Sequence, residues 1–148
     1  MRQIRALLQS EKNLPLSSIV TAARTDSLPD DCRKAIAKRG IRTLQISRNV
    51  PDDPNAAGVR SATLCRLKGL KFRAVFIAGA DGGSVPSAQA LNAATSKKER
   101  PEAEPAERSL FLAALTRAVD RLYISCSDTP GECLKQPIDC EAAKSKAA

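Results

Sequence analysis

The sequence predicts a small α/β domain whose sheet has about five strands, mostly parallel. Short apolar segments alternate along the chain with segments of helical periodicity, which is typical of a parallel sheet with helices on both faces. The chain has 148 residues, enough for one domain with its own core, and 43% of them are hydrophobic, which argues against wholesale disorder.

Four elements are expected in the first part of the chain. Apolar side chains at helical spacing predict a helix over residues 2–11, and residues 18–23 are a β-branched run typical of a buried strand. Residues 30–39 have the pattern of a helix that is acidic at its start, basic at its end and closed by a glycine. Residues 41–46 alternate as a second strand, so this strand–helix–strand unit predicts parallel pairing with a right-handed crossover.

Two further strands and a long loop are expected next. Residues 59–65 are a strand candidate. Residues 72–78 carry the strongest buried-strand pattern in the chain, and we expect Ala74–Ala78 at the centre of the sheet. Residues 79–105 are rich in Gly, Ser, Ala, Asn and Pro and predict a surface loop, with a helical turn near residues 89–93.

The last predicted elements are a helix and a strand. Periodic apolar residues predict a helix over 107–120, packed on one face of the sheet, and a strand over 121–126. We therefore divide the chain into an N-terminal helix (1–14), a globular domain (15–127) and a flexible tail (128–148).

The composition excludes several classes of function. Without histidine there is no Ser-His-Asp or Cys-His catalysis and no His-bearing metal site. The five cysteines are widely spaced and form no CxxC pair, so we predict no metal site. No apolar stretch approaches the roughly 18 residues of a membrane span, and no secretory signal is apparent, so we expect a cytoplasmic protein without membrane contact.

The charge indicates the kind of partner. The 24 basic and 16 acidic residues give a formal charge of +8, which favours a polyanion. Aromatic residues make up only 3% of the chain, which argues against a surface on which bases stack. Any contact with nucleic acid should therefore be made mainly to phosphates.

Two segments carry the residues best suited to chemistry. The first places four cations (Arg66, Lys68, Lys71 and Arg73) in and beside the turn that joins two predicted strands, near a sheet edge where open α/β folds bind ligands. The local sequence alone favours a simpler interpretation, a solvated basic turn. In the second segment, Arg117 interrupts a nearly continuous apolar stretch.

A guanidinium at position 117 has two alternative roles. It can form a structural ion pair, with Asp120 or Glu107 as the nearest acids in sequence, because a buried unpaired charge is costly. Alternatively, it can reach a ligand phosphate and stabilise charge on a transferring phosphoryl group.

Together these segments resemble motifs V and VI of superfamily-1 DNA helicases of the UvrD/Rep kind. The matching stretches are KGLKF with AVFIAG after it, ERSLFLAALTRAVDRLYIS, and upstream SSIVTAARTDS, which resembles a family strand ending in R-T-N. The resemblance covers residues 16–127. It implies a RecA-like fold of the P-loop NTPase type and the second motor domain of an ATP-driven 3′–5′ DNA helicase.

The resemblance also implies roles for individual residues. Arg117 matches the catalytic motif VI arginine that reaches the ATP γ-phosphate from across a cleft between domains, and Gly69 and Lys71 match nucleotide contacts. The residues that match contacts to single-stranded DNA are Arg24, Thr25, Thr63, Arg66 and Lys68.

The chain departs from the family at several of these positions. Cys65 stands where motif V has a DNA-contacting histidine, and Lys71 replaces the glutamate that binds the ribose. The large 2B insertion before motif V is absent, and motif VI is changed at Ala106, Ser109 and Leu112.

The sequence contains neither a Walker A motif nor a D-E-x-Q motif. We therefore expect no ATP hydrolysis by this chain alone, and binding of ATP and Mg²⁺ only with a chain or domain that carries the first RecA-like half. Three interpretations stay open: a helicase domain or fragment, a non-catalytic DNA- or partner-binding module, and a decaying gene product without a role.

Overall fold

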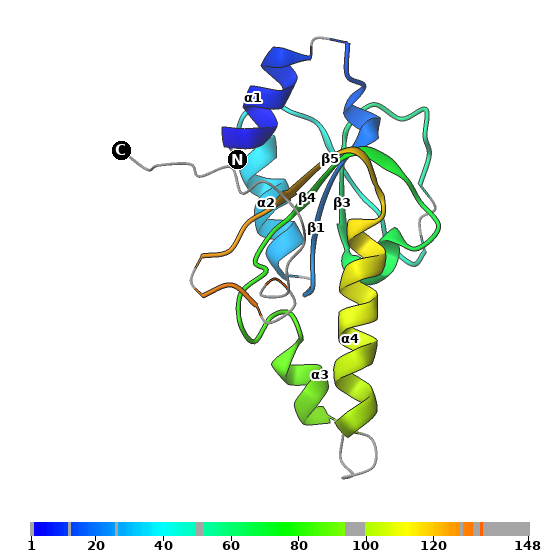
Figure 1. Cartoon of the computed structure of the whole chain (residues 1–148). Coiled ribbons are helices and arrows are strands. Elements are labelled where there is room, and N and C mark those ends of the chain that lie inside the picture. The colour runs from blue at the N-terminus through cyan, green and yellow to red at the C-terminus, as the bar shows by residue number, and fades with distance from the viewer. Residues whose placement is uncertain are drawn as a thin grey trace.

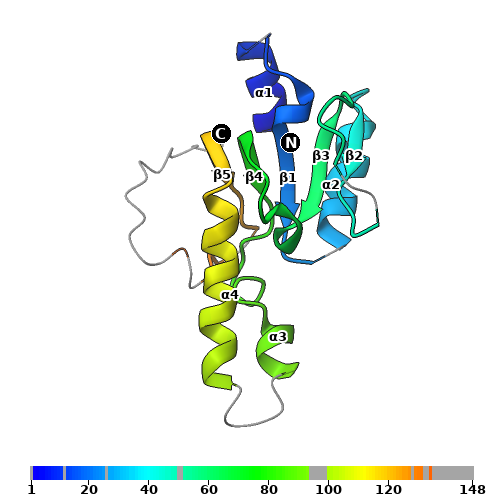
Figure 2. The same cartoon turned by 90° about the vertical axis from the view of Figure 1, so that its right-hand side faces the viewer.

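The computed structural model describes residues 2–11, 13–25, 27–49, 52–93, 100–127, 129–131 and 134. The elements are α1 (Arg2–Ser10), the 3₁₀ helix η1 (Leu16–Ser18), β1 (Ile19–Ala23), α2 (Ser27–Ala37), β2 (Thr43–Gln45), β3 (Val59–Thr63), the 3₁₀ helix η2 (Leu64–Leu67), β4 (Phe72–Ile77), α3 (Ala88–Ala93), α4 (Arg100–Leu115) and β5 (Ala118–Ile124). The strands form one sheet in the order β2-β3-β1-β4-β5, and every pairing is parallel (Figure 1, and Figure 2 for all five strand labels). The predicted α/β fold with a mostly parallel sheet is confirmed.

The central strand is β1, which lies between β3 and β4. All five of its residues are buried. The expectation that Ala74–Ala78 would be central is wrong, because β4 lies between β1 and the edge strand β5. Both β1 and β4 are apolar runs covered on both faces, so their composition does not indicate which one occupies the middle. The strand–helix–strand unit is parallel as expected, but β3 separates β1 from β2.

Helices cover both faces of the sheet, which lies between α2 and α4 in Figure 1. Alternate residues of each strand point to opposite faces. Val20 and Val75 therefore join Phe111 of α4 in one apolar cluster. Their neighbours Ile19 and Ala74 join the second cluster, on the side of α1 and α2. The prediction that the helix before the last strand packs on one face is confirmed.

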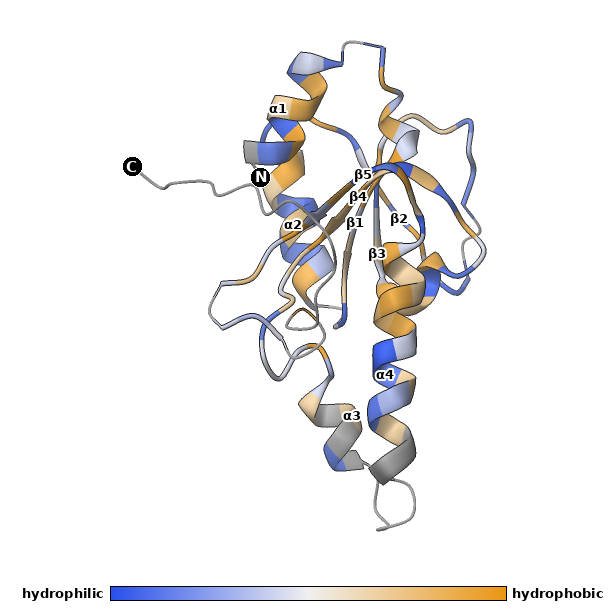
Figure 3. Cartoon of the chain, in the orientation of Figure 1, coloured by the Kyte–Doolittle hydropathy of each residue, from blue (hydrophilic) through white to orange (hydrophobic). Residues whose placement is uncertain are grey.

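The boundaries of α4 differ from the predicted helix over 107–120. The helix begins at Arg100, inside the predicted surface loop, continues through Pro105, and ends at Leu115. Its first turns extend past the sheet beside α3, as Figure 2 shows. Figure 3 shows that the hydrophobic residues of α4 (orange) are concentrated in the turns beside the sheet, and the hydrophilic residues (blue) in the turns farther away. The apolar pattern alone therefore located only the packed half of the helix.

Other boundaries also changed. The turn predicted near 89–93 is α3, but the segment before it is not wholly on the surface, because Ala80 and Val85 are buried. The third strand ends at Thr63, and the chain continues as η2. Most of the predicted tail, 128–148, lies outside the described residues. Within the described part, no helix has the length and apolar character needed to span a membrane.

Candidate nucleotide and nucleic-acid interface

Arg117 lies at the amino edge of the sheet, in the turn between α4 and β5. Its backbone carbonyl accepts a hydrogen bond from the amide of Phe72, the first residue of β4, at 2.9 Å. This bond brings the turn beside Lys71, which is exposed. Two positions of the predicted nucleotide site, distant in sequence, are therefore neighbours at one edge of the sheet.

The guanidinium of Arg117 is held by the end of α4. Its Nε donates to the carbonyl of Ala113 at 2.9 Å, and its Nη2 donates to the hydroxyl of Thr116 at 2.9 Å. Among the described residues it has no carboxylate partner. The alternative of an ion pair with Asp120 or Glu107 is wrong, because each of these acids pairs with another arginine. The positive charge at position 117 is thus held in place, and no acid of the described residues pairs with it.

The acids near Arg117 in sequence pair elsewhere. Asp120 accepts from Arg73 Nε at 2.6 Å at the surface of β4 and β5. Glu107 pairs with Arg24 at the opposite edge of the sheet. Both acids that lie near Arg117 in sequence are therefore paired with other arginines.

A small polar cleft lies at the carboxyl edge, where β2 and β3 end. It has a volume of about 100 Å³. Thr63 and Arg66, both expected at the DNA site, line it. Sequence reasoning missed Gln45, Ser47 and Arg48, which also line it and directly follow or end β2. The rule that parallel sheets bind ligands at the carboxyl ends of strands would have indicated them.

Neither arginine of this carboxyl-edge cleft has an ion pair within the described part of the chain. Arg48 and Arg66 are both exposed, so their side chains are free to contact a solvated anion. The half-buried Thr63, which lines the same cleft, adds a hydroxyl group. Guanidinium groups beside a hydroxyl group are suited to binding phosphate oxygens.

Arg24, by contrast, is engaged within the protein. Its Nε and Nη2 donate to the two carboxylate oxygens of Glu107, at 2.7 and 2.6 Å. Glu107 also accepts the amide of Ser87 at 3.2 Å. The hydrogen bonds from Arg24 hold the pKa of the Glu107 carboxyl below its usual value, and the carboxylate raises the pKa of Arg24. Thr25, the next residue, is exposed.

Lys68 and Gly69 lie in the turn that follows η2, where the chain runs back toward the amino edge. Lys68 is exposed and has no ion pair among the described residues. Gly69 has a φ of +84°, a conformation that favours glycine. Cys65, at the position of the family histidine, is exposed. No three potential metal ligands of the described residues come together.

Comparison with known proteins identifies the family. The model of the UvrD-like helicase C-terminal domain matches residues 8–129. The chain belongs to this family. It is 41% identical over 69 residues to "Putative ATP-dependent DNA helicase YjcD" of Bacillus subtilis (strain 168), covering 47% of this chain and 9% of that protein. It is 30% identical over 100 residues to ATP-dependent DNA helicase UvrD1 of Mycobacterium leprae (strain TN), covering 68% of this chain and 12% of that protein.

This UvrD-like C-terminal domain thus spans about a tenth of the length of the curated relatives it matches. A solved structure has the same fold: the C-terminal domain of a possible DNA helicase from Lactobacillus plantarum WCFS1. The TM-score is 0.55 at 19% identity, and the match covers 88% of this chain and 66% of that one. The family resemblance drawn from motifs V and VI is confirmed.

Proposed function

We propose that the UvrD-like C-terminal domain serves as the second half of an ATP-driven DNA motor. Arg117 acts on a nucleotide held by a separate Walker-A half, and the carboxyl edge contacts single-stranded DNA. The observation that carries this proposal is the separation of two sets of cations, unpaired among the described residues, on opposite edges of one sheet. Arg117 and Lys71 lie at the amino edge, and Arg48 and Arg66 lie at the carboxyl edge.

Arg117 fits a phosphate because its charge is free while its position is fixed. Two of its N–H groups bond to the end of α4, which orients the guanidinium and leaves other N–H groups for a ligand. An arginine supplied from outside the phosphate-binding loop stabilises charge on the transferred phosphoryl group. ATP and Mg²⁺ would be held by the complementary half, with Gly69 and Lys71 beside the nucleotide.

The DNA track consists of the carboxyl-edge cleft and the neighbouring turn. Arg48, Arg66 and Lys68 provide charges for phosphates, and Thr63 provides a hydroxyl group. Arg24 is assigned a positioning role, because its guanidinium is already bound to Glu107 and fixes the end of β1 beside Thr63. Thr25 is accessible next to it.

A salt titration of DNA binding tests this division. Three phosphate contacts predict a log–log slope near −2 on an oligothymidylate, at about −0.7 for each contact. Arg66→Ala should lower the slope by about one contact and weaken all sequences alike, and Lys68→Ala should do the same. Arg117→Ala removes the same charge from the opposite edge and should leave the slope unchanged, as measured by fluorescence anisotropy.

The opposite result would overturn the division between the edges. If Arg117→Ala abolished DNA binding while Arg66→Ala and Lys68→Ala had no effect, the DNA track would not lie at the carboxyl edge. The wild-type domain serves as the reference at every salt concentration.

A second candidate function is a DNA- or partner-binding module that has lost the motor. Lys71 favours it, because a cation at the family's ribose contact reverses the charge at a nucleotide site. Cys65, in place of the histidine, removes a DNA contact of the family. ATPase assays with a separately produced Walker-A half distinguish the two functions, since only the motor requires Arg117.

A further inference from the structure

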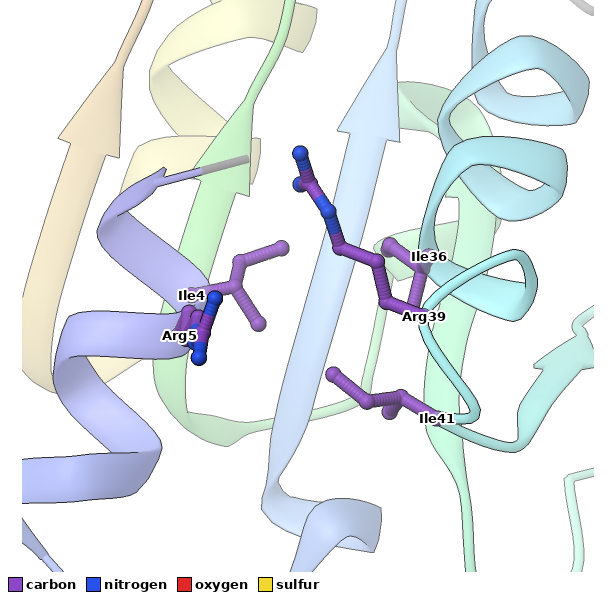
Figure 4. A pocket seen from close by; sticks show the side chains of 5 residues that line it. All are labelled: Ile4, Arg5, Ile36, Arg39 and Ile41. Carbon is purple, nitrogen blue, oxygen red and sulfur yellow. The ribbon is translucent and has the colours of Figure 1, made fainter.

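A second pocket lies on the opposite face of the sheet from α4, between α1 and the end of α2. Its volume is about 340 Å³, within the range of ligand-binding pockets. Five residues line it: Ile4, Arg5, Ile36, Arg39 and Ile41. Figure 4 shows that Ile4 and Arg5 come from α1, and the other three come from α2 and the chain after it, with β1 behind them.

The pocket has an apolar floor and a basic rim. Ile4 and Ile36 are only 3% and 1% exposed, whereas Arg5 and Arg39 are exposed. Neither arginine has an ion pair within the described part of the chain, and none of the lining residues is acidic. An arginine is always charged in a protein, so the rim carries two positive charges that no acid of the described residues neutralises.

Residues next to the pocket rim add further positive charge. Lys38 and Arg42 flank the rim in sequence, and both are exposed without an ion pair among the described residues. The acids of α2, Asp30 and Asp31, lie at the other end of the helix, where they pair with arginine and lysine of the next turn. A ligand with several negative charges would therefore complement this end of α2 better than one with a single charge.

We propose that this pocket binds an acidic peptide segment of a partner protein. One large aliphatic side chain of the peptide enters the pocket and contacts Ile4, Ile36 and Ile41, and flanking carboxylates pair with Arg5 and Arg39. A nucleic acid fits less well, because its phosphates could use the rim but would leave the isoleucine floor uncovered. The site lies at the opposite end of α2 from the carboxyl-edge cleft, which Pro29 lines, so both can be occupied together.

The test uses the full chain with its isoleucine methyl groups labelled for NMR. The probe is the peptide GDEDLDEDG, and two controls are GDEDSDEDG and an oligothymidylate. The leucine peptide should shift the methyl signals of Ile4, Ile36 and Ile41 and leave that of Ile46, which lines the carboxyl-edge cleft, unchanged. Replacing the leucine by serine should weaken binding more than tenfold, because the buried aliphatic contact is lost.

Variants complete the test. Arg5→Gln and Arg39→Gln should each weaken the leucine peptide about two- to fivefold, as expected for exposed ion pairs. Arg48→Gln, the same change at the carboxyl edge, should leave peptide binding unchanged. The proposal fails if the serine peptide binds as tightly, if Arg48→Gln weakens the peptide equally, or if no methyl signal shifts at about 5 mM peptide. It also fails if the oligothymidylate displaces the peptide, which would indicate a nucleic-acid site.

Discussion

Arg24 and Glu107, which are 83 positions apart in sequence, form a bidentate ion pair between the end of β1 and the middle of α4. The side chains are 22% and 10% exposed, so the pair is largely shielded from water. Glu107 also accepts the amide of Ser87, near the start of α3. One carboxylate thereby fixes three segments at the carboxyl edge.

This pair predicts an acid-sensitive stability. The hydrogen bonds from Arg24 place the pKa of Glu107 in the folded protein below its unfolded value. The pair therefore stabilises the fold above the unfolded pKa of about 4.3, and this contribution is lost as pH falls through the folded pKa. Glu107→Gln should lower the free energy of unfolding by about 1–3 kcal/mol at pH 7, and the difference from wild type should shrink toward pH 3. Urea unfolding of both proteins at several pH values measures this difference in the free energy of unfolding.

The control for Glu107→Gln is Glu104→Gln on the same helix. Glu104 pairs with Arg108 at 2.8 Å, but the two side chains are 49% and 31% exposed. An exposed pair contributes about 0–1 kcal/mol, so this change should have little effect at any pH. Equal losses from both substitutions would contradict the special role given to Glu107.

A second prediction concerns Arg60, a fully buried cation in β3. Its Nε donates to Asp52 at 2.8 Å, and its Nη1 donates to the carbonyls of Ala56 and Gly58 at 2.7 Å each. Arg60→Met leaves these acceptors without their donor in the loop between β2 and β3. We expect a loss of about 3–5 kcal/mol in urea unfolding, as for a broken buried ion pair.

Arg73→Met is the matched control for Arg60→Met. Arg73 is 49% exposed and pairs with Asp120 and Glu11 at the surface. Its loss should therefore change the free energy of unfolding little, because exposed ion pairs contribute little to stability. A larger effect at Arg73 than at Arg60 would show that the loop does not depend on the buried arginine.

A third prediction concerns Gly79, directly after β4 and Ala78. Its φ is +65°, and a Cβ atom there would lie 2.4 Å from Cδ2 of Leu28 in α2. Gly79→Ala should destabilise the fold by about 2–4 kcal/mol, through backbone strain and through overpacking against α2. Gly69→Ala has similar strain but no neighbour within 4 Å, so it should cost only about 1–2 kcal/mol in thermal unfolding. Equal losses would mean that Leu28 moves aside freely.

The sequence predicted the elements whose signals are local. Apolar runs located β1 and β4, and the apolar stripe around Phe111 located the packed half of α4. The end of that helix was misplaced because Ala118 and Leu122 continue the helical spacing into β5. The hydrogen bond from Phe72 to Arg117 and the pairing of Phe72 with Ala118 decide the boundary, and both join residues distant in sequence.

The same distinction holds for the candidate site. The resemblance to motifs V and VI indicated Arg117, Thr63 and Arg66, which lie at or beside the ends of predicted strands. The partner of Arg24 could not be predicted, because Glu107 is brought to it by the packing of α4 on the sheet. Arg48 lies in a loop without a periodic pattern, and only its place just after the end of β2 could have indicated it.

The last prediction concerns ATP hydrolysis. The 148-residue chain has no Walker A motif, so the purified domain should show no ATPase activity above background, with or without single-stranded DNA. Mixing it with a separately produced Walker-A half of a UvrD-like helicase should give DNA-stimulated turnover. Arg117→Ala should reduce this turnover about 10³-fold or more, as for loss of an arginine that stabilises the transferred phosphoryl group.

Arg121→Ala is the control for Arg117→Ala in that mixture. It removes the same charge four residues away, but Arg121 pairs with Glu11 of the segment after α1 and is not free for a ligand. Its turnover should stay near that of the wild-type mixture, because the proposed contact with the γ-phosphate belongs to Arg117. Equal turnover in the two variant mixtures would favour the second candidate function, a binding module that has lost the motor. ATPase activity of the domain alone that survived repeated purification would contradict the need for a second half.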